Sequence, residues 1–158
     1  LGTLAAETPK GQAYIQKEKL LADFIASKFN ATAIELGSNN AYVDRLFYRN
    51  GKLVSIAEIK NRELSIEKLY KYNSYLISHD KIKHGAKISE LLKVPYFIFV
   101  HLIRSGKIVY FQITNEEGLE ISDYTIRQTE TKADCNGSLA FRYNAFLSLD
   151  QMTVIDAL

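Results

Sequence analysis

The chain has 158 residues, 47% hydrophobic and 24% charged, a balance that suits one globular domain (1–158) with a sizeable core. Its formal net charge of +2 is too mild to indicate a nucleic-acid partner by itself. The only cysteine, Cys135, excludes an internal disulfide and a cysteine-based zinc site, which favours a reducing, cytoplasmic setting. The sequence shows no membrane-spanning stretch and no signal peptide, so we expect no membrane partner.

A helix is predicted from Pro9 to about Phe29, with Thr8 as its N-cap and Pro9 in its first turn. Glu18 lies in the apolar stripe of this helix, where an unpaired acid is costly, whereas Asp23 lies on a more polar face. Glu18 therefore either belongs to a site or extends from the edge of the stripe into water, and the helix pattern allows both.

Three strands are expected after this helix: a short one at 32–36 and two that form a hairpin between 42 and 60. Asp44 lies on the first strand of the hairpin, and Glu58 and Lys60 lie on the second. Because side chains alternate along a strand, Glu58 and Lys60 point to the same face.

The turn of this hairpin, at Asn50-Gly51, decides whether Asp44 lies on the same face of the strands as Glu58 and Lys60. A two-residue turn pairs Arg49 with Lys52 and, in a regular ladder, places Asp44 on the opposite face from Glu58. A three-residue loop with a left-handed glycine and a bulge shifts the register by one residue. We therefore predict a bulge or a longer loop, which brings Asp44 to the face of Glu58.

After the hairpin, apolar residues of helical period predict a second helix that starts after Ser65 and runs on until Gly85 interrupts or ends it, with a further helical piece at 86–93. The apolar run 96–103 predicts a strand buried on both faces, and a right-handed parallel crossover should connect it to the strand of Glu58. Further strands are expected at 107–114, 124–131 and 139–143. The capping-box pattern at 148–151 predicts a short last helix.

The order of these elements, together with four residues, resembles the PD-(D/E)XK nuclease superfamily. Glu18 on the first helix, Asp44 on a strand and Glu58-x-Lys60 on the next strand stand where that superfamily carries its site. The resemblance implies an α/β, restriction-endonuclease-like fold. Its αβββαβ core would run from about Pro9 to Ile103, with a mixed central sheet flanked by helices and extra C-terminal strands.

Two departures from the superfamily pattern leave the branch open. Val43 stands where the superfamily's name has a proline. RecB-like members carry Gln-x-x-x-Tyr on the helix after the lysine strand; here Tyr72 matches, but Lys68 replaces the glutamine. The sequence is compatible with the RecB-like, the Holliday-junction-resolvase-like and the VRR-type branches.

The predicted site suits a hard cation and a phosphodiester. Mg²⁺ prefers oxygen ligands and keeps several waters, so Asp44 and Glu58 suit it, with Mn²⁺ as the alternative. Lys60 would orient the attacking water or stabilise charge on the phosphate, and Glu18 would bind a second metal or a metal-bound water. The resemblance adds the backbone carbonyl of Ile59 as a metal ligand. It implies a deoxyribonuclease, expected to be an endonuclease, with RNA as the alternative substrate.

Nucleic-acid contacts are expected from basic and polar side chains near this site and from tyrosines of the second helix. They are Arg45, Arg49, Lys52, Asn61, Arg62, Lys68, Lys71, Tyr72 and Tyr75. A solvated basic face is the alternative for each residue, and His101 fits a core histidine better than a metal ligand. Two rival functions stay open. One is a catalytically silent nucleic-acid- or protein-binding module on the same fold; the other is an interaction protein whose late strands pair with a partner, which also allows a homodimer.

Overall fold

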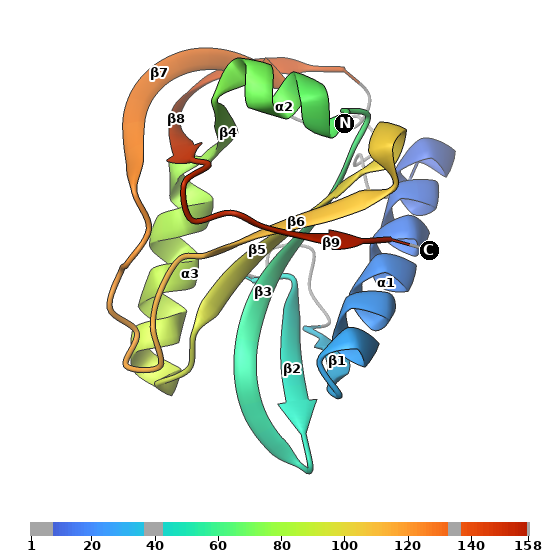
Figure 1. Ribbon diagram of the computed structural model, residues 1–158, viewed down its shortest axis with the longest axis vertical. Coiled ribbons are helices and arrows are strands. Elements are labelled where there is room, and N and C mark those ends of the chain that lie inside the picture. Colours follow the sequence, from blue (N-terminus) through green and yellow to red (C-terminus); the bar gives the residue numbers. More distant parts are fainter. Residues whose placement is uncertain (1–7, 37–42, 133–136, 158) are drawn as a thin grey trace.

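The computed structural model describes residues 8–36, 43–132 and 137–157, with the backbone alone described at 131 and 132 (Figure 1). The helices are α1 (Pro9–Lys28), α2 (Ile66–Tyr72) and α3 (His79–Leu92), with a short 3₁₀ turn, η2, at Ile103–Ser105. The strands are β1 (Thr32–Glu35), β2 (Arg45–Arg49), β3 (Lys52–Arg62), β4 (Ser74–Ser78), β5 (Tyr96–Leu102), β6 (Lys107–Gln112), β7 (Tyr124–Lys132), β8 (Leu139–Ser148) and β9 (Thr153–Asp156). The prediction for Cys135 lies outside the described residues.

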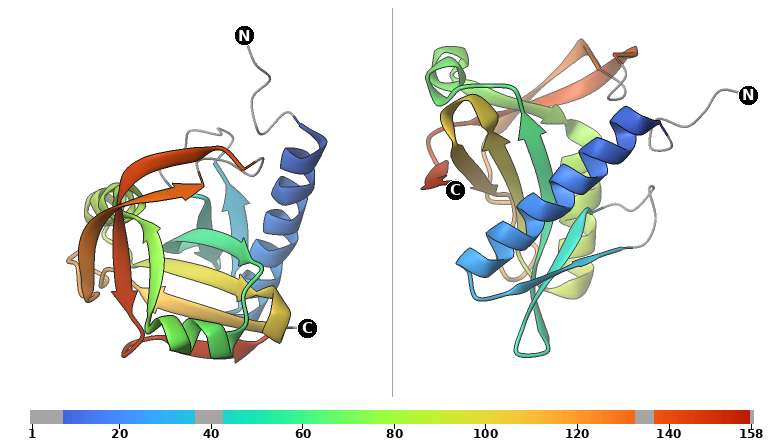
Figure 2. Two further views of the ribbon diagram at one scale, coloured as in Figure 1. Left: turned by 90° about the horizontal axis from the view of Figure 1, so that it is seen from above. Right: turned by 90° about the vertical axis from the view of Figure 1, so that its right-hand side faces the viewer.

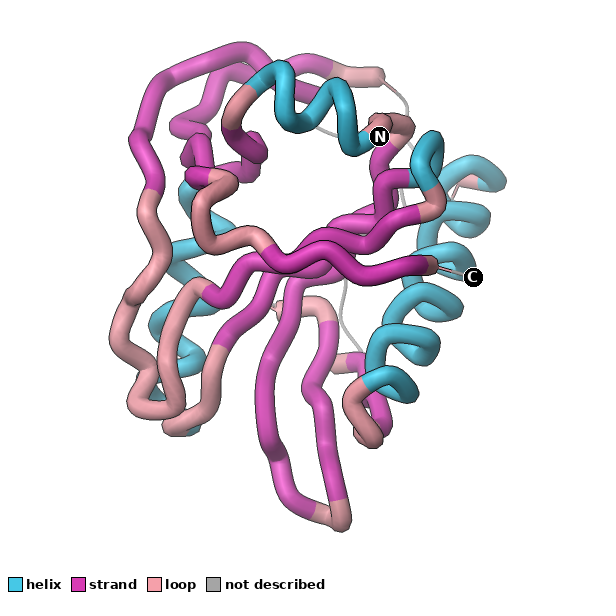
Figure 3. Tube along the Cα trace, viewed as in Figure 1, coloured by secondary structure: helices cyan, strands magenta, loops and turns pink. Residues whose placement is uncertain are grey.

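The described strands form two sheets. A six-stranded sheet has the order β1-β2-β3-β5-β6-β9, and a three-stranded sheet has the order β4-β8-β7. In the larger sheet β3 and β5 are parallel and the other neighbouring pairs are antiparallel, so the predicted mixed sheet and the parallel pairing are confirmed. Figure 3 shows the helices, in cyan, lying on either side of this sheet.

Two apolar clusters hold the layers together. On one face of the large sheet, Ile25 of α1 packs with Ile59 and Phe99. On the other face, Ile56 and Ile98 pack with Ile82 of α3 and with residues of the smaller sheet. The large sheet is therefore buried on both faces, which explains the continuous apolar run of β5.

The first helix follows the sequence pattern closely. The Thr8 hydroxyl accepts a hydrogen bond from the backbone N–H of Gly11 at 3.0 Å, and Pro9 opens the helix. The predicted N-cap is therefore confirmed, and it fixes where the helix begins relative to Glu18.

The β2–β3 hairpin contains both a tight turn and a bulge. Arg49 pairs with Lys52 across a two-residue turn, in which Asn50 and Gly51 have φ of 52° and 75°. These left-handed values are what a type I′ turn requires. The register then shifts, because Tyr48 pairs with Leu53 while Phe47 pairs with Ser55. The prediction of a bulge or a longer loop is confirmed by the bulge, which lies at Val54 and accompanies a two-residue turn.

The segment between β3 and β5 corrects the sequence prediction. The predicted helix begins after Ser65 as expected but does not run on to Gly85: α2 ends at Tyr72, and Asn73 takes a left-handed conformation with φ of 61°. The strand β4 follows and pairs with β8, and α3 then begins at His79. The smaller sheet buries Tyr75 and Ile77, and this tertiary packing overrides the local helical period.

Gly85 lies within α3 and does not end it. A Cβ at this position would lie 2.1 Å from the ring of Tyr96 on β5, so only glycine allows this approach of helix to sheet. The C-terminal prediction is also wrong, since 149–151 form a turn that leads into β9. The Ser148 hydroxyl accepts from the N–H of Asp150 at 3.2 Å and closes this turn without a helix.

Candidate active site

Glu58 lies at the centre of the large sheet and is fully buried. It shares the face of Ile56 on β3, toward α3, because alternate residues of a strand point the same way. Its Oε1 lies 3.1 Å from Nζ of Lys60 and 3.2 Å from Nζ of Lys81. Neither carboxylate oxygen accepts a hydrogen bond of good geometry from a described residue. Two ammonium groups thus balance a buried charge whose hydrogen-bonding capacity is unused.

Asp44 lies one residue before β2 and next to Glu58. The register pairs Arg45 with Ala57, so the next position along the ladder places Asp44 opposite Glu58. The backbone N–H of Ile59 donates to Oδ2 of Asp44 at 2.8 Å and fixes the carboxylate. Burial and the charge of Glu58 raise the pKa of Asp44 to about 6, against the opposing effects of Lys60 and the Ile59 N–H. The bulge has therefore brought two acids together that electrostatically disfavour each other's charge.

Glu18 joins this cluster from α1. Its Oε1 lies 3.6 Å from Nη1 of Arg45, and its side chain is 31% exposed. The same Arg45 nitrogen donates to the carbonyl oxygen of Asp44 at 2.8 Å, which ties the helix to the start of β2. Burial, then the charge of Asp44, raises the pKa of Glu18 to about 7, although Lys60 and Arg45 act to lower it. The pKa of Glu18 therefore depends on the charges of Asp44, Lys60 and Arg45.

Lys60 remains charged in this setting. Burial acts to lower the pKa of its ammonium, but the carboxylates of Glu58 and Asp44 raise it above its ordinary value. The cation lies on the same side of β3 as Glu58, as the strand alternation predicts.

Lys81 is a site residue that the sequence analysis missed. It lies in the first turn of α3, and its carbonyl oxygen accepts from the hydroxyl of Tyr96 at 3.2 Å. The close packing of Gly85 on the Tyr96 ring sets the same helix against the sheet one turn later. Because the predicted helix ran through 74–78, the start of α3 was hidden. The signal that marks it is Asn73, a typical helix-stop residue, followed by the Tyr-Leu-Ile run of β4.

The donor set fits a hard divalent cation supported by two carboxylates. Among the described side chains, no three His, Cys, Asp or Glu residues lie close enough together to hold a metal ion. Mg²⁺ needs fewer protein ligands, since one or two carboxylates, waters and a substrate phosphate complete its shell. The carboxylate oxygens of Glu58, beside Asp44, are suitable ligands, because neither accepts a hydrogen bond from a described residue even though Oε1 is ion-paired with Lys60 and Lys81. Ile59 contributes its backbone N–H to this cluster, where it donates a hydrogen bond to Asp44.

The residues expected to contact nucleic acid divide into three groups, which are buried, half-buried and exposed. Arg45 is buried against Glu18, and Tyr75 is buried and stacked on Phe111 with ring centroids 5.8 Å apart, so neither side chain is free for a contact. Asn61 is half-buried, and its Oδ1 lies 3.0 Å from Nδ1 of His101. The remaining side chains are exposed: Arg49, Lys52, Arg62, Lys68, Lys71 and Tyr72. Within that group, Nζ of Lys68 lies 6.0 Å from the ring centroid of Tyr72 on α2.

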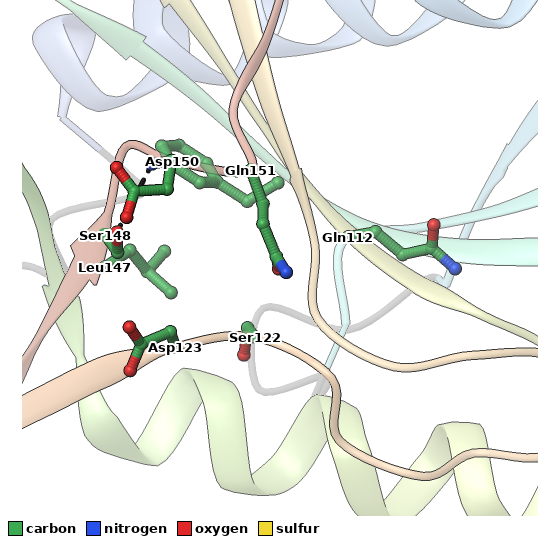
Figure 4. A pocket seen from close by; sticks show the side chains of 8 residues that line it. Gln112, Ser122, Asp123, Leu147, Ser148, Asp150 and Gln151 are labelled. Atoms are coloured by element: carbon green, nitrogen blue, oxygen red, sulfur yellow. Dashed lines mark hydrogen bonds between the residues drawn. The ribbon is translucent and has the colours of Figure 1, made fainter.

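Two cavities lie away from this cluster. The smaller, about 100 Å³, lies where the β6–β7 connection meets the turn after β8, and Figure 4 shows Ser122, Asp123 and Gln151 around it. The larger, about 560 Å³, has an aromatic lining that includes Phe97 and Tyr110, on the α1 side of the large sheet. None of the four predicted catalytic residues lines either cavity.

Comparisons with known proteins support one family. A family model described as "Phage putative PDDEXK endonuclease" matches residues 7–136, which include Glu18, Asp44, Glu58, Lys60 and Lys81. No curated protein and no solved structure gives a significant match to the chain. Within the described ranges, no helix is both long and apolar enough to cross a bilayer.

Proposed function

Because the chain belongs to the family of phage PDDEXK endonucleases, itself part of the PD-(D/E)XK superfamily, we propose that it is a Mg²⁺-dependent endonuclease that hydrolyses phosphodiester bonds of DNA. One observation carries the assignment of its site. The carboxylate of Glu58 is fully buried, lies beside Asp44 and two lysines, and accepts no hydrogen bond from a described residue. Burial of such a group costs free energy, which the two lysine ion pairs offset only in part, and a metal ligand is the role that uses its remaining oxygen lone pairs.

The elements around the site fit the restriction-endonuclease-like core. We assign α1, β1, β2, β3, α3 and β5 to the αβββαβ order, with α2 and β4 as an insertion in the crossover. The whole chain then forms one domain, because both apolar clusters include residues of the large sheet. In this arrangement Asp44, one residue before β2, and Glu58 of β3 meet near the start of the parallel pairing of β3 with β5.

Each residue of the cluster has a distinct role in the proposal. Asp44 and Glu58 hold the cation, with the Ile59 carbonyl as the further ligand implied by the family. When bound, Mg²⁺ or Mn²⁺ lowers the pKa of a water and neutralises charge on the scissile phosphate. Glu18, whose pKa of about 7 lets it exchange a proton near neutrality, accepts hydrogen bonds from water that enters beside Asp44.

The two lysines provide the positive charge that the reaction requires. Lys60 and Lys81 contact the same oxygen of Glu58 at 3.1 and 3.2 Å. Lys60 is the more buried of the two and stabilises the negative charge that develops on the phosphate. Lys81, which is 38% exposed, binds a neighbouring non-bridging phosphate oxygen from the α3 side.

Cleavage assays test the proposal directly. Plasmid, linear duplex and branched DNA are incubated with the protein in Mg²⁺, Mn²⁺ or EDTA. Cleavage is expected with either metal and not in EDTA, and Glu58→Gln and Lys60→Ala should abolish it. Glu90→Gln, which removes an exposed acid of α3, serves as the matched control and should cut like the parent. If Glu58→Gln and Lys60→Ala both fold and both cut like the parent, the assignment of the site is wrong.

A further inference from the structure

The carboxylate of Glu58 is paired with two ammonium groups at a single oxygen. Its Oε1 lies 3.1 Å from Nζ of Lys60 and 3.2 Å from Nζ of Lys81. The side chain of Glu58 is fully buried, so the two lysines, rather than water, balance its charge. A divalent cation that binds this carboxylate therefore competes with both lysines for the same negative charge.

The described site residues carry as many positive as negative formal charges. They are the acids Glu18, Asp44 and Glu58 and the bases Arg45, Lys60 and Lys81. A divalent cation held by Asp44 and Glu58 adds two positive charges to this buried cluster. Because like charges repel strongly at short range in a medium of low dielectric constant, binding of the cation favours the departure of one base.

Lys81 is the base that can leave most easily. Arg45 is held by its hydrogen bond to the carbonyl oxygen of Asp44, and its side chain is only 5% exposed. The side chain of Lys60 is 24% exposed, whereas that of Lys81 is 38% exposed. Among the described acids, Glu58 alone pairs with Lys81. The ammonium of Lys81 therefore has the shortest way to solvent and no second acid to hold it.

The backbone of Lys81 is fixed, so only its side chain has to move. Its carbonyl oxygen accepts from the Tyr96 hydroxyl at 3.2 Å, and Gly85 packs on the ring of Tyr96 one turn later. Figure 2 shows α1 and α3 on opposite sides of β3, so Lys81 approaches Glu58 from the α3 side alone. The flexible four-carbon stem of a lysine lets its ammonium change partners while the helix stays in place.

We propose that Lys81 neutralises Glu58 in the metal-free protein and moves from Glu58 to the substrate phosphate when a divalent cation binds. The inference rests on the proposed nuclease function and adds how its site is regulated. Cation binding converts Lys81 from a counter-ion of Glu58 into a phosphate ligand, while Lys60 stays beside Glu58. A variant without the Lys81 ammonium should therefore bind the cation more tightly and yet cleave DNA more slowly.

Mn²⁺ titrations without DNA, followed by electron paramagnetic resonance at pH 8, compare the parent with Lys81→Met. Methionine keeps most of the unbranched stem and removes the charge. We expect Lys81→Met to bind Mn²⁺ about tenfold more tightly than the parent, because the competing cation is gone. Lys81→Arg retains the charge and should bind Mn²⁺ no more tightly than the parent. Lys87→Met, which removes an exposed lysine of the same helix, should bind Mn²⁺ like the parent.

Amine acetylation of the parent reports the movement of Lys81 itself. The protein is treated with acetic anhydride with and without saturating Mn²⁺, and peptide mass spectrometry compares Lys81 with Lys87. The ion pair with Glu58 keeps the Lys81 amine protonated and shielded, so its release should raise the acetylation rate severalfold relative to Lys87. In Glu58→Gln the acetylation of Lys81 should be fast from the start and should not respond to Mn²⁺.

Different results overturn the inference and the nuclease assignment. Equal or weaker Mn²⁺ binding by folded Lys81→Met would show that Lys81 does not compete with the cation. Tighter binding without a change in Lys81 acetylation would show that Lys81 repels the cation from a fixed position. Release of Lys81 without DNA cleavage in any metal would leave the exchange intact and remove the nuclease. A parent that binds no Mn²⁺ would remove both.

Discussion

The pair of acids in the active site should make the metal-free protein less stable as the pH rises, and Asp44→Asn isolates this effect. The folded-state pKa of Asp44 is about 6, above its ordinary value of 3.8, because of burial and the neighbouring charge of Glu58. The folded protein therefore holds this proton more tightly than the unfolded chain. The free energy of unfolding then falls as the pH rises through the window between these two values and levels off above about pH 7.

The size of the effect follows from the same shift. One pKa unit corresponds to about 1.4 kcal/mol, so the shift of Asp44 is worth up to about 3 kcal/mol. Asparagine cannot ionise, and its side-chain oxygen still accepts from the N–H of Ile59, which keeps the local structure. Relative to the parent, Asp44→Asn should gain stability between pH 4 and pH 7 by up to about 3 kcal/mol.

Urea unfolding at half-unit pH intervals, in EDTA, measures this difference. Asp23→Asn removes an exposed carboxylate of α1 and controls for the loss of one charge. Saturating Mg²⁺ at pH 8 should nearly cancel the difference, stabilising the parent by about 2.7 kcal/mol at one hundred times Kd and leaving Asp44→Asn nearly unchanged. If the stability difference between Asp44→Asn and the parent does not change with pH, the two acids are not coupled as described.

Three further substitutions test the structure around the site. Gly85→Ala should lower the free energy of unfolding by about 1–3 kcal/mol in thermal melts, because its methyl group would lie 2.1 Å from the Tyr96 ring; an unchanged Tm would contradict this packing. Thr8→Ala should cost about 1 kcal/mol through loss of the α1 N-cap, and full stability would show that the cap is dispensable. Lys81→Met should lower kcat about 100-fold with the fold retained, whereas the exposed-lysine control Lys87→Met should not; equal rates would remove Lys81 from the site.

The sequence predicted where the candidate site residues lie better than it predicted the chain around them. Glu58 and Lys60 could be placed on one face because strand alternation is a local rule. The bulge near Val54 could be inferred because Asp44 has to reach that face, but its position could not, since a tight Asn50-Gly51 turn and a bulge further along satisfy the same register. The sequence thus indicated that the register must shift by one residue, and the pairing of the two strands determined that a bulge near Val54 provides this shift.

The segment 74–78 shows where helical periodicity misled the prediction. Its apolar residues have a period compatible with a helix, and only pairing with β8, about 70 residues later, makes it a strand. Gly85 was misinterpreted for the same reason, because its need for glycine comes from Tyr96 and not from a helix end. Lys81 could not be found while the helix that carries it was hidden. Long-range pairing overrides local propensity in each of these cases.

The proposed activity depends on Glu58 binding a divalent cation together with Asp44. Mn²⁺ binding followed by electron paramagnetic resonance, on the parent and on Glu58→Gln, measures this most directly. Glutamine keeps the volume of the buried side chain and removes its charge. We therefore expect the parent to bind Mn²⁺ and the variant to bind it about 10–100-fold more weakly. Equal Mn²⁺ affinity in the two folded proteins would contradict the metal site, and with it the proposed mechanism.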